Sequence, residues 1–409
     1  MTTSPVPPRW QQVAAAAGLL DADGGVRATV FAEMSALAAR TGALNLGQGF
    51  PDVDGPAPVA RAAADAVLAG HNQYPPGPGI PALRQAVAAH RAARYGTTLD
   101  PDREVLVTTG ATEALAAAVL ALTGPGDEVL TLEPFYDSYA AVVAMAGARH
   151  TTAPLVATPD GFRLDADALA AAVTPRTRLL LLNSPHNPTG AVLRRDELEA
   201  VARLAVAHDL LVVTDEVYEH LTFGVPHVPL ATLPGMAGRT LTVSSSGKTF
   251  SFTGWKIGWV TGPEELVTAV RTVKQFLTYV SGAPFQPAVA AALTDPAALA
   301  WVDDLVASLA GRRDLLAAGL REAGFDVVRP DGTYFVLADA APLGYADGVA
   351  LCRDLPALAG VVGVPVRAFT QPGSAADRAL GSWVRFTFVK RREVLEEAVA
   401  RLARLRTAV

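Results

Sequence analysis

The chain has 409 residues, enough for one large domain or two domains with a sizeable core. Half of the residues are apolar, 18% are charged and the net charge is −6, so no basic stripe is available to neutralise nucleic-acid phosphates. The single cysteine, the lack of metal-site spacing, and the absence of a signal peptide or a membrane-length apolar run predict a cytoplasmic protein without disulfide, metal or membrane partner.

The N-terminal part of the sequence mixes irregular and helical patterns. Residues 1–25 are rich in proline and alanine without firm periodicity, and we expect a loose arm there. Helices are predicted at 30–41 and 59–69. The segment 71–79, His-Asn-Gln-Tyr-Pro-Pro-Gly-Pro-Gly, must be an irregular loop because its prolines and glycines oppose both helix and central strand.

From residue 81 onward, helical and strand-like segments alternate. The predicted helices are 82–95, 112–122, 138–146, 195–208 and 264–276, and the predicted strands are 105–108, 128–132, 179–182, 210–214, 240–243 and 258–261. The apolar runs of the strands are continuous, which is typical of strands covered on both faces. The pattern therefore predicts an α/β fold around a mostly parallel sheet.

A different unit follows the Gly/Pro-rich loop 281–287. It is predicted to hold a long helix around 288–323, strands near 325–329, 334–338 and 383–387, and a final helix at 392–405. We expect an N-terminal arm with part of the small domain at 1–50, a large domain at 51–287 and a small domain at 288–409.

Ligands of open α/β sheets bind at the carboxyl ends of the strands, so the polar residues that follow the predicted strands are candidate site residues. Thr109-Gly110-Ala111-Thr112 opens a helix and suits a phosphate, although an ordinary helix cap is the alternative. Tyr136, in the next loop, suits stacking on a flat ring or simple packing. The loop 183–190 has two X-Pro bonds, either of which can be cis, and is rigid enough to hold the Asn187 amide at a ligand oxygen.

One acid and two lysines complete the set. Asp215 ends an apolar strand, where a carboxylate is costly to bury unless it meets a cation or a donor. The hydroxyl-rich stretch 244–259 carries Lys248 and, eight residues later, Lys256. One lysine suits imine chemistry with a carbonyl while the other, with Ser245, holds a phosphate; a polar loop with two solvated lysines is the alternative. Together these loops describe a site for pyridoxal 5′-phosphate.

Three motifs carry a resemblance to a known family. Asn187-Pro188-x-Gly190, Asp215-x-x-Tyr218 and Ser245-x-x-Lys248 are similar to the signatures of class I/II aminotransferases of fold type I, and their spacing also matches. The stretches 45–52, 72–74 and 247–256 resemble the kynurenine/methionine aminotransferase branch. The stretches 74–79, 133–139 and 282–290 resemble actinobacterial N-succinyldiaminopimelate aminotransferases more closely still.

The resemblance implies fold type I, with a mostly parallel seven-stranded sheet in the large domain and a smaller α+β domain. It implies that Lys248 forms the Schiff base with the cofactor aldehyde and then moves the Cα proton. It further implies that Asp215 pairs with the pyridine nitrogen, that Asn187 and Tyr218 hydrogen-bond the ring hydroxyl oxygen, and that Tyr136 stacks on the ring.

The remaining implied roles concern the phosphate and the substrate. The phosphate ligands would be Gly110, Ala111, Thr112, Ser245 and Lys256, joined by Tyr74 of the neighbouring subunit, so a homodimer is expected. Arg385, in the apolar strand 383–387, would bind the substrate α-carboxylate with Asn187 and the Gly47 backbone. A surface arginine on an edge strand is the alternative for Arg385.

Several functions and positions stay open. The leading function is amino-group transfer between an L-amino acid and a 2-oxo acid, with N-succinyl-LL-diaminopimelate and 2-oxoglutarate as one candidate pair. The alternative is a kynurenine, methionine or glutamine type of aminotransferase with cysteine-conjugate β-lyase activity. A regulator with this fold would need a DNA-binding domain before it, and the arm has no basic helix. Arg367 either binds an acidic substrate or projects outward, and His186 is interpreted as loop structure. Tyr279, Phe285 and Tyr334 are further candidates for substrate choice.

Overall fold

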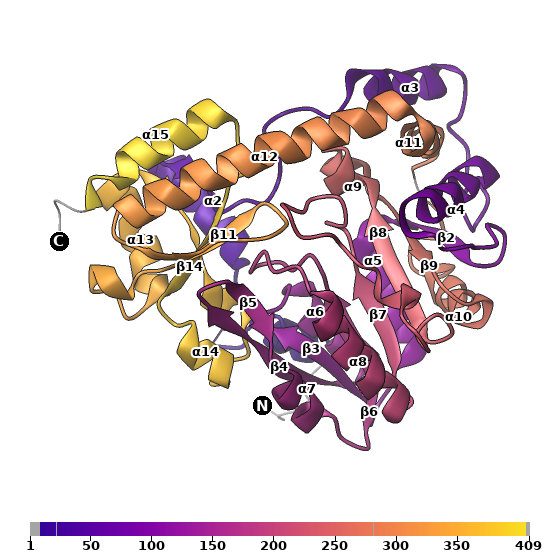
Figure 1. Ribbon diagram of the computed structural model, residues 1–409, viewed down its shortest axis with the longest axis horizontal. Helices are drawn as coiled ribbons and strands as arrows, with labels where there is room; N and C mark the ends of the chain where they lie inside the picture. The colour runs from indigo at the N-terminus through magenta and orange to yellow at the C-terminus, as the bar shows by residue number, and fades with distance from the viewer. Residues whose placement is uncertain (1–8, 22, 281, 406–409) are drawn as a thin grey trace.

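A mostly parallel sheet lies at the centre of the larger half of the chain (Figure 1). The computed structural model describes residues 9–21, 23–280 and 282–405, and within these residues the sheet has eight strands in the order β2-β9-β8-β7-β6-β3-β4-β5. The strands are β2 (Val105–Thr109), β3 (Glu128–Glu133), β4 (Arg149–Thr158), β5 (Gly161–Leu164), β6 (Thr177–Asn183), β7 (Leu211–Asp215), β8 (Thr240–Ser245) and β9 (Ile257–Thr261). Strands β4, β3, β6, β7 and β8 are parallel, whereas β9 runs antiparallel to both of its neighbours.

The predicted α/β class agrees with this architecture, but the predicted seven strands are one too few. Strand β5 turns back from β4 as an antiparallel hairpin, with Leu155 opposite Leu164 and Thr158 opposite Gly161. The sequence of this hairpin gave no strand prediction because polar and half-exposed residues interrupt its apolar positions. Continuous apolar runs, as in the other strands, occur only where both faces are covered.

Alternate residues of the central strands enter two different cores. Leu179 and Leu181 of β6 pack with helices on one face, and Leu180 and Leu182 pack with helices on the other. The first face is covered by α5 (Gly110–Leu122), α6 (Ser138–Ala146) and α10 (Glu264–Lys274), and the second by α7 (Ala166–Ala172) and α8 (Arg195–Ala207). Each fully buried leucine contributes about 2 kcal/mol of transfer free energy, which holds the strand ends in place.

The C-terminal unit has its own antiparallel sheet, in the order β10-β11-β14-β13. Its elements are β10 (Asp326–Val328), β11 (Phe335–Asp339), α13 (Gly348–Ala359), β12 (Val361–Val362), β13 (Val364–Pro365), α14 (Ala375–Ala379), β14 (Trp383–Thr387) and α15 (Arg392–Leu402). The N-terminal segment joins this unit, because α2 (Val30–Thr41) packs on α13 and β1 (Leu44–Asn45) pairs in parallel with β12. These pairings place the N-terminal segment with the C-terminal unit. The domain division at residues 50 and 287 stays a prediction.

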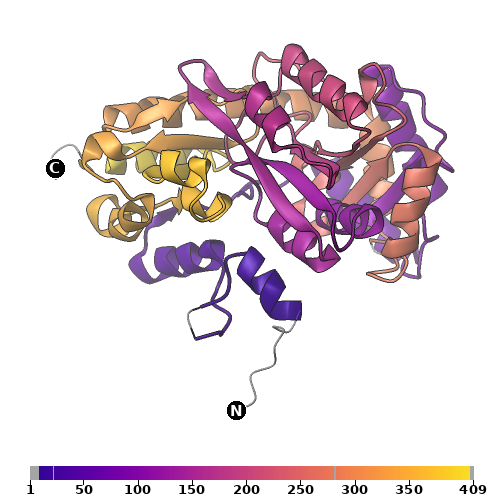
Figure 2. The same ribbon diagram turned by 90° about the horizontal axis from the view of Figure 1, so that it is seen from below.

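Two predicted features of the helices are wrong. The helix expected over 288–323 is two helices, α11 (Phe285–Thr294) and α12 (Pro296–Glu322). Asp295 separates them because its carboxylate accepts from the Ala297 N–H and caps α12, where the missing N–H of Pro296 costs nothing. The N-terminal arm contains helix α1 (Arg9–Ala16), which packs on α6; residues 1–8 lie outside the described residues. Figure 2 shows α1 and α2 on one side of the molecule.

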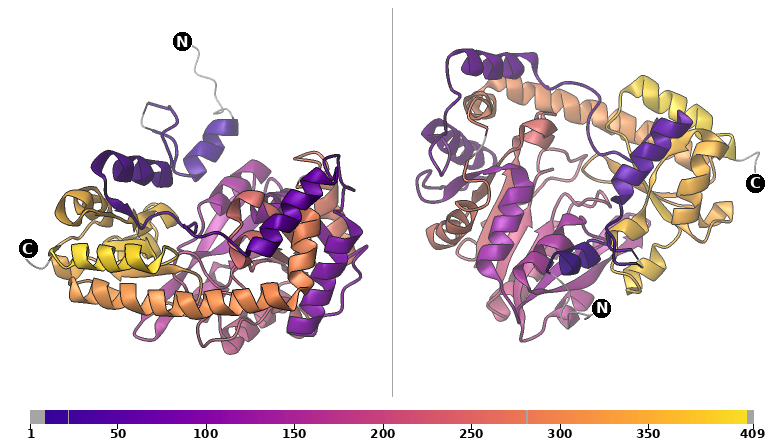
Figure 3. Two further views of the ribbon diagram at one scale, coloured as in Figure 1. Left: turned by 90° about the horizontal axis from the view of Figure 1, so that it is seen from above. Right: turned by 180° about the vertical axis from the view of Figure 1, so that it is seen from behind.

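Helix α12 connects the two halves of the chain along one edge of the molecule (Figure 1), and α15 lies alongside it (Figure 3). The remaining helices are α3 (Ala57–Leu68), α4 (Pro81–Tyr95) and α9 (Ser246–Thr249), with short 3-10 turns at Leu230–Thr232, Thr253–Trp255, Ala341–Leu343 and Val366–Phe369. The loop 71–79 is irregular, as predicted. None of the described helices is both long and apolar enough to cross a membrane.

Candidate active site

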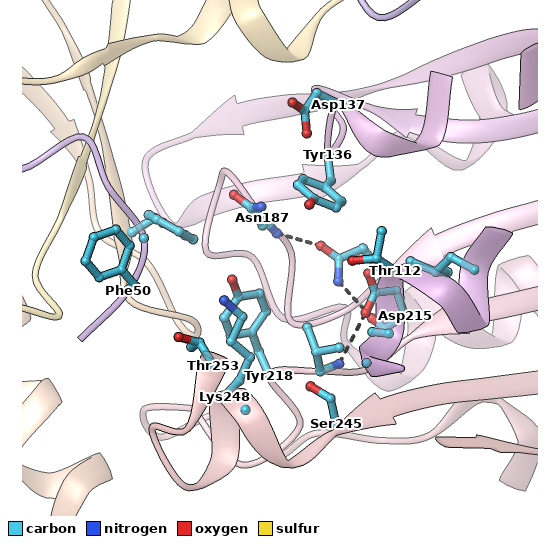
Figure 4. Close-up of a pocket in the computed structure, with 18 of the residues that line it drawn as sticks. Phe50, Thr112, Tyr136, Asp137, Asn187, Asp215, Tyr218, Ser245, Lys248 and Thr253 are labelled. Atoms are coloured by element: carbon cyan, nitrogen blue, oxygen red, sulfur yellow. Dashed lines mark hydrogen bonds between the residues drawn. The ribbon is translucent and has the colours of Figure 1, made fainter. Parts of the chain in front are cut away.

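A cavity of about 460 Å³ opens at the carboxyl ends of the central strands. The predicted site residues that line it are Gly110, Ala111, Thr112, Tyr136, Asn187, Asp215, Tyr218, Ser245, Lys248, Lys256 and Arg385. Phe31, Gln48 and Phe50 of the N-terminal segment also line it, together with Phe335 of β11. The sheet, the N-terminal segment and the C-terminal unit therefore each contribute to one site (Figure 4).

One end of the cavity is built to receive an anion. Helix α5 begins directly after β2 at Gly110, whose φ of +68° is a conformation that favours glycine. A Cβ on Gly258 of β9 would lie 2.6 Å from the Gly110 carbonyl carbon, so both positions must be glycine for this close approach. Lys256 Nζ lies 3.4 Å from Thr112 Oγ1, and Ser245 lines the same cavity. The helix N-terminus, two hydroxyls and an ammonium group are a suitable donor set for a phosphate.

Asp215 is buried at the end of β7 and faces the cavity. Its Oδ2 accepts a hydrogen bond of 2.7 Å from the Tyr139 hydroxyl, and its Oδ1 accepts one of 3.3 Å from the Val217 N–H. Burial raises the pKa of this carboxyl to about 6, against the lowering effect of these hydrogen bonds. Across the described parts of the chain, no lysine, arginine or histidine forms an ion pair with Asp215. A cationic ligand group would supply the missing counter-charge.

Lys248 and Tyr218 stand on the other side of the cavity in the view of Figure 4. Lys248 lies in α9, the single helical turn that follows β8, and its Nζ donates a hydrogen bond of 2.8 Å to the Tyr334 hydroxyl. The Tyr218 ring is buried, with its centroid 5.6 Å from Lys248 Nζ. Burial raises the pKa of Tyr218 well above its usual value, so this phenol keeps its proton at neutral pH.

Arg385 places a buried guanidinium at the floor of the cavity. Its Nη1 donates to Asn187 Oδ1 at 3.0 Å and its Nη2 donates to the Gly47 carbonyl at 2.9 Å, so Gly47 meets the arginine through its C=O. The Nε–H has no partner within the described residues, and the Phe335 ring centroid lies 4.0 Å from the guanidinium carbon. Burial lowers the pKa of Arg385 to about 10, which leaves it charged at neutral pH. A ligand carboxylate is the natural partner of such a group.

Behind the cavity, a buried polar network holds the segments that carry these side chains. Arg91 of α4 forms ion pairs with Glu216 at 3.2 Å and with Glu219 at 3.6 Å. Ser244 donates a hydrogen bond of 2.5 Å to Glu219, and Tyr95 donates one of 2.7 Å. All of these residues except Tyr95 are buried.

Three histidines extend this network. His227 Nε2 lies 3.0 Å from Glu216 Oε2, and His220 Nε2 lies 3.0 Å from His90 Nε2. The other ring nitrogen of His220 lies 3.3 Å from Thr249 Oγ1. Burial lowers the pKa of His220 to about 3, so its ring is neutral at physiological pH. Four network residues, Glu216, Glu219, Ser244 and Thr249, are each a direct chain neighbour of a cavity residue, namely Asp215, Tyr218, Ser245 and Lys248.

Comparison with known proteins identifies the family. A family model described as aminotransferase class I and II matches residues 41–402. The chain belongs to this family. It is a pyridoxal 5′-phosphate-dependent aminotransferase, which acts on an amino acid and a 2-oxo acid. The resemblance seen in the sequence is confirmed.

Individual relatives of this aminotransferase cover nearly all of the chain. A probable N-succinyldiaminopimelate aminotransferase of Mycobacterium tuberculosis is 59% identical over 92% of this chain and 95% of that protein. The solved structure of the N-succinyldiaminopimelate aminotransferase from M. tuberculosis has a TM-score of 0.89 and covers 92% of this chain and 97% of the solved chain. The methionine aminotransferase of Escherichia coli is 38% identical over 92% of this chain and 96% of that protein.

The cavity of this aminotransferase fits the cofactor. Asp215 is a buried acid with no ion-pair partner among the described residues, the α5 N-terminus and Lys256 form an anion site, and Lys248 brings its amine to the same cavity. Asp215 suits the ring nitrogen of pyridoxal phosphate, the anion site suits its phosphate, and Lys248 suits its aldehyde. Among the described residues, no group of histidine, cysteine or acidic side chains could hold a metal ion.

Three other sequence candidates lie outside the cavity lining. Tyr74 is 81% exposed and packs edge-on against Tyr279, with ring centroids 5.6 Å apart. The Arg367 side chain is 44% exposed and lies 3.7 Å from Asp377, which agrees with the outward projection. His186 is buried in its loop, where its Nδ1 lies 2.8 Å from Thr189 Oγ1, and burial lowers its pKa to about 3. The bonds before Pro134, Pro185 and Pro188 are cis.

Sequence reasoning missed two tyrosines that contact the site. Tyr139 is the second residue of α6 and stands three residues after Tyr136, in a turn that brings the two ring centroids to 5.7 Å; that spacing could have suggested a shared site. Tyr334 was considered only for substrate choice, yet its hydroxyl contacts Lys248. It precedes an apolar strand of the other unit, and no spacing in the sequence connects it to Lys248.

Proposed function

We propose that the residues of this cavity carry out amino-group transfer and that the substrates are N-succinyl-LL-diaminopimelate and 2-oxoglutarate. The observation that carries the site assignment is the buried Asp215, which has no ion-pair partner in the part of the chain that the structure describes, across the cavity from the Lys248 amine. The 59% identity to the M. tuberculosis aminotransferase, over nearly the full length of both chains, supports the substrate pair.

The cofactor would be held at four points. Gly110, Ala111, Thr112, Ser245 and Lys256 would bind its phosphate, Asp215 would pair with its protonated ring nitrogen, and Tyr136 would stack on its ring. Asn187 and Tyr218 would hydrogen-bond the ring hydroxyl oxygen. When bound, pyridoxal phosphate supplies a carbonyl carbon for a covalent bond with an amine and a ring that takes up the electron pair left at the substrate Cα.

The chain's own residues would supply orientation and proton movement. The guanidinium of Arg385, fixed by Asn187 and the Gly47 carbonyl, would bind the substrate α-carboxylate and so direct Cα toward Lys248. Lys248 Nζ would attach the cofactor in the resting enzyme and, once released by the substrate amine, take the Cα proton. The fully buried setting of Asp215 makes its ion pair with the ring nitrogen stronger than it would be in water.

The proposal includes a homodimer in the cytoplasm, with Tyr74 of one subunit at the phosphate of the other. The exposed aromatic side chains of Tyr74 and Phe276, 81% and 86% accessible, support a partner surface there. The cytoplasmic location rests on the resemblance to biosynthetic enzymes and on the sequence expectation.

The second candidate is a kynurenine, methionine or glutamine type of aminotransferase with cysteine-conjugate β-lyase activity. The aromatic side chains of Phe31 and Phe50 at the cavity favour it, because they suit an apolar substrate side chain. The 38% identity to the E. coli methionine aminotransferase also supports it.

A half-reaction screen separates the candidates. The purified protein loaded with pyridoxal phosphate is mixed with N-succinyl-LL-diaminopimelate, kynurenine, methionine or glutamate, and the cofactor absorbance is followed. We expect the fastest conversion with N-succinyl-LL-diaminopimelate, at least tenfold above methionine and kynurenine. Faster conversion by methionine or kynurenine would contradict the proposed substrate pair and favour the second candidate. Pyruvate release from a cysteine conjugate would establish the β-lyase activity. A wild-type protein that stays colourless with added cofactor would contradict the site assignment itself.

A further inference from the structure

Tyr334 is a buried tyrosine that reaches Lys248 from outside the main cavity. Its side chain is 1% exposed, and it lies directly before β11, in the C-terminal unit. It lines a small internal space next to the cavity, together with Lys248, Gly247 and Leu221. Two parts of the fold that are distant in sequence therefore meet at the Lys248 amine.

The Tyr334 hydroxyl both donates and accepts a hydrogen bond. It donates to the Gly49 carbonyl at 2.6 Å and accepts from Lys248 Nζ at 2.8 Å. A phenol hydroxyl has one proton to donate and can also accept. Because the Gly49 carbonyl can only accept, the Tyr334 proton is directed to Gly49, and Tyr334 acts as the acceptor toward Lys248.

The direction of the hydrogen bond from Lys248 to Tyr334 affects which proton transfers the amine can make. The amine gives an N–H to Tyr334, so its lone pair is not engaged by this bond and can receive a proton from the cavity side. An ammonium group also has an N–H to give, so the bond persists after the proton has been taken up. Tyr334 can thus hold the released amine in both protonation states.

The position of the Tyr334 hydroxyl is fixed from several sides. The backbone carbonyl of Tyr334 accepts from the Phe388 N–H at 2.9 Å and from Thr387 Oγ1 at 3.0 Å. Its ring packs edge-on against Tyr218, with centroids 5.3 Å apart. On the opposite side, a Cβ on Gly49 would lie 2.5 Å from the Phe335 ring, so a glycine is required for the Gly49 carbonyl to come this close.

We propose that Tyr334 is a positioning residue, which orients the free amine of Lys248 during proton removal from the substrate Cα. The proposal rests on the proposed role of Lys248 as the base. In the step itself, the Cα–H bond breaks and an N–H bond forms at Lys248 Nζ, while the electron pair stays with the substrate carbon, for which bound cofactor would supply the electron sink. The Tyr334 hydroxyl keeps its own proton throughout and donates it to the Gly49 carbonyl.

The first experiment uses Tyr334→Phe, which removes one oxygen atom and keeps the ring. We expect kcat to fall tenfold or more, KM to change less than about twofold, and the kinetic isotope effect with Cα-deuterated substrate to increase. The absorbance of bound cofactor in the resting enzyme should stay unchanged. Tyr345→Phe is the matched control, since the Tyr345 hydroxyl bonds Asp354 at 3.1 Å at the surface of the same unit. An unchanged kcat, or a lower kcat without an increased isotope effect, would overturn the proposal.

A second experiment asks whether Tyr334 acts through Lys248. In Lys248→Ala, proton removal is restored with a small exogenous amine such as methylamine. Adding Tyr334→Phe should then change the rescued rate by less than about twofold, because the exogenous base is not held by Tyr334. The same tenfold loss in this background would contradict the positioning role. Retained activity of Lys248→Ala without any added amine would instead contradict the proposed role of Lys248.

Discussion

Asp215 carries an unfavourable charge in the protein without cofactor, and this charge makes the stability of the cofactor-free protein depend on pH. Its pKa of about 6 in the folded chain exceeds the ordinary value of 3.8, so the folded state binds more protons than the unfolded state between these two pH values. Stability of the cofactor-free protein therefore falls as the pH rises from about 4 to 6. The full effect is roughly 3 kcal/mol, at about 1.4 kcal/mol per pKa unit.

Asp215→Asn should remove this penalty. We expect the cofactor-free variant to melt at a higher temperature than the cofactor-free wild type at pH 7.5, with the difference vanishing toward pH 4. With pyridoxal phosphate bound, the order should reverse, because the neutral amide cannot pair with a protonated ring nitrogen. Thermal unfolding of both proteins across this pH range, with and without cofactor, measures the effect. A lower melting temperature of the cofactor-free variant at pH 7.5 would contradict it.

Arg385 and Arg367 form a natural pair for testing the carboxylate site. Arg385→Ala removes the buried cation and leaves the Asn187 and Gly47 oxygens without their donors. Loss of two charge-assisted hydrogen bonds should lower kcat/KM by roughly 10²–10⁴-fold. Arg367→Ala serves as control, since its half-exposed side chain lies outside the cavity lining, and should change kcat/KM less than about threefold. Steady-state kinetics with one amino donor measures both losses. A larger loss of kcat/KM in Arg367→Ala than in Arg385→Ala would show that the wrong arginine has been assigned.

The sequence predicted those site residues whose side chains are unusual for the sequence around them. Arg385 in an apolar strand and Asp215 at the end of one are anomalies that require a partner, and both line the cavity. The Gly47 backbone was placed with Arg385 only through the family resemblance, and the Tyr139 hydroxyl was not placed at Asp215 at all, because both reach the site through folding of distant segments. Tyr334 was the hardest residue to predict, because a tyrosine among apolar residues is ordinary and gives no sign of a polar contact.

At the scale of elements, the polar network couples helix α4 to the strand ends behind the cavity. Arg91 is the cation that faces both Glu216 and Glu219, and all three side chains are buried. Arg91→Met should leave two buried carboxylates without their cation and destabilise the protein by about 3–5 kcal/mol. Denaturation by urea at pH 7 measures the change.

Arg94→Met is a suitable control for that substitution. Arg94 lies on the same helix, is exposed and forms no ion pair within the described residues, so its replacement should cost less than about 1 kcal/mol. Equal midpoints for the two variants would show that the network does not stabilise the fold.

The elements that the sequence predicted well have a regular apolar pattern, either along a strand that is buried throughout or on one face of an amphipathic helix. Strand β14 and helix α2 have the predicted bounds, because continuous apolar runs and helical periodicity end there abruptly. The β4–β5 hairpin was missed because its residues alternate between buried and accessible positions near the edge of the sheet. The break between α11 and α12 was missed because the apolar helical pattern continues on both sides of it. Asp295-Pro296, which caps and begins α12, was not interpreted as the start of a new helix.

For the whole molecule, the decisive prediction concerns the shared active site. If Tyr74 binds the phosphate of the neighbouring subunit, Tyr74→Ala and Lys248→Ala homodimers should each be inactive, and mixing them should restore activity. Random exchange gives half heterodimers, each with one intact site, so about a quarter of wild-type activity is expected.

Subunit exchange is verified by mass spectrometry of differently tagged chains. A mixture of Tyr74→Phe and Tyr74→Ala provides the control, because neither chain of that heterodimer can complement the other at position 74. Proven exchange without recovery in the first mixture would place Tyr74 outside the partner's site.

The alternation of cavity and network residues along the chain has a consequence for laboratory evolution. At 215/216, 218/219, 244/245 and 248/249, neighbouring residues serve opposite sides of the same backbone. A one-residue insertion or deletion within these segments would exchange the two sides and place glutamates in the cofactor cavity. Libraries intended to alter substrate choice should therefore vary side-chain identity around Phe31, Phe50 and Phe335, and keep chain length constant from residue 215 to residue 249.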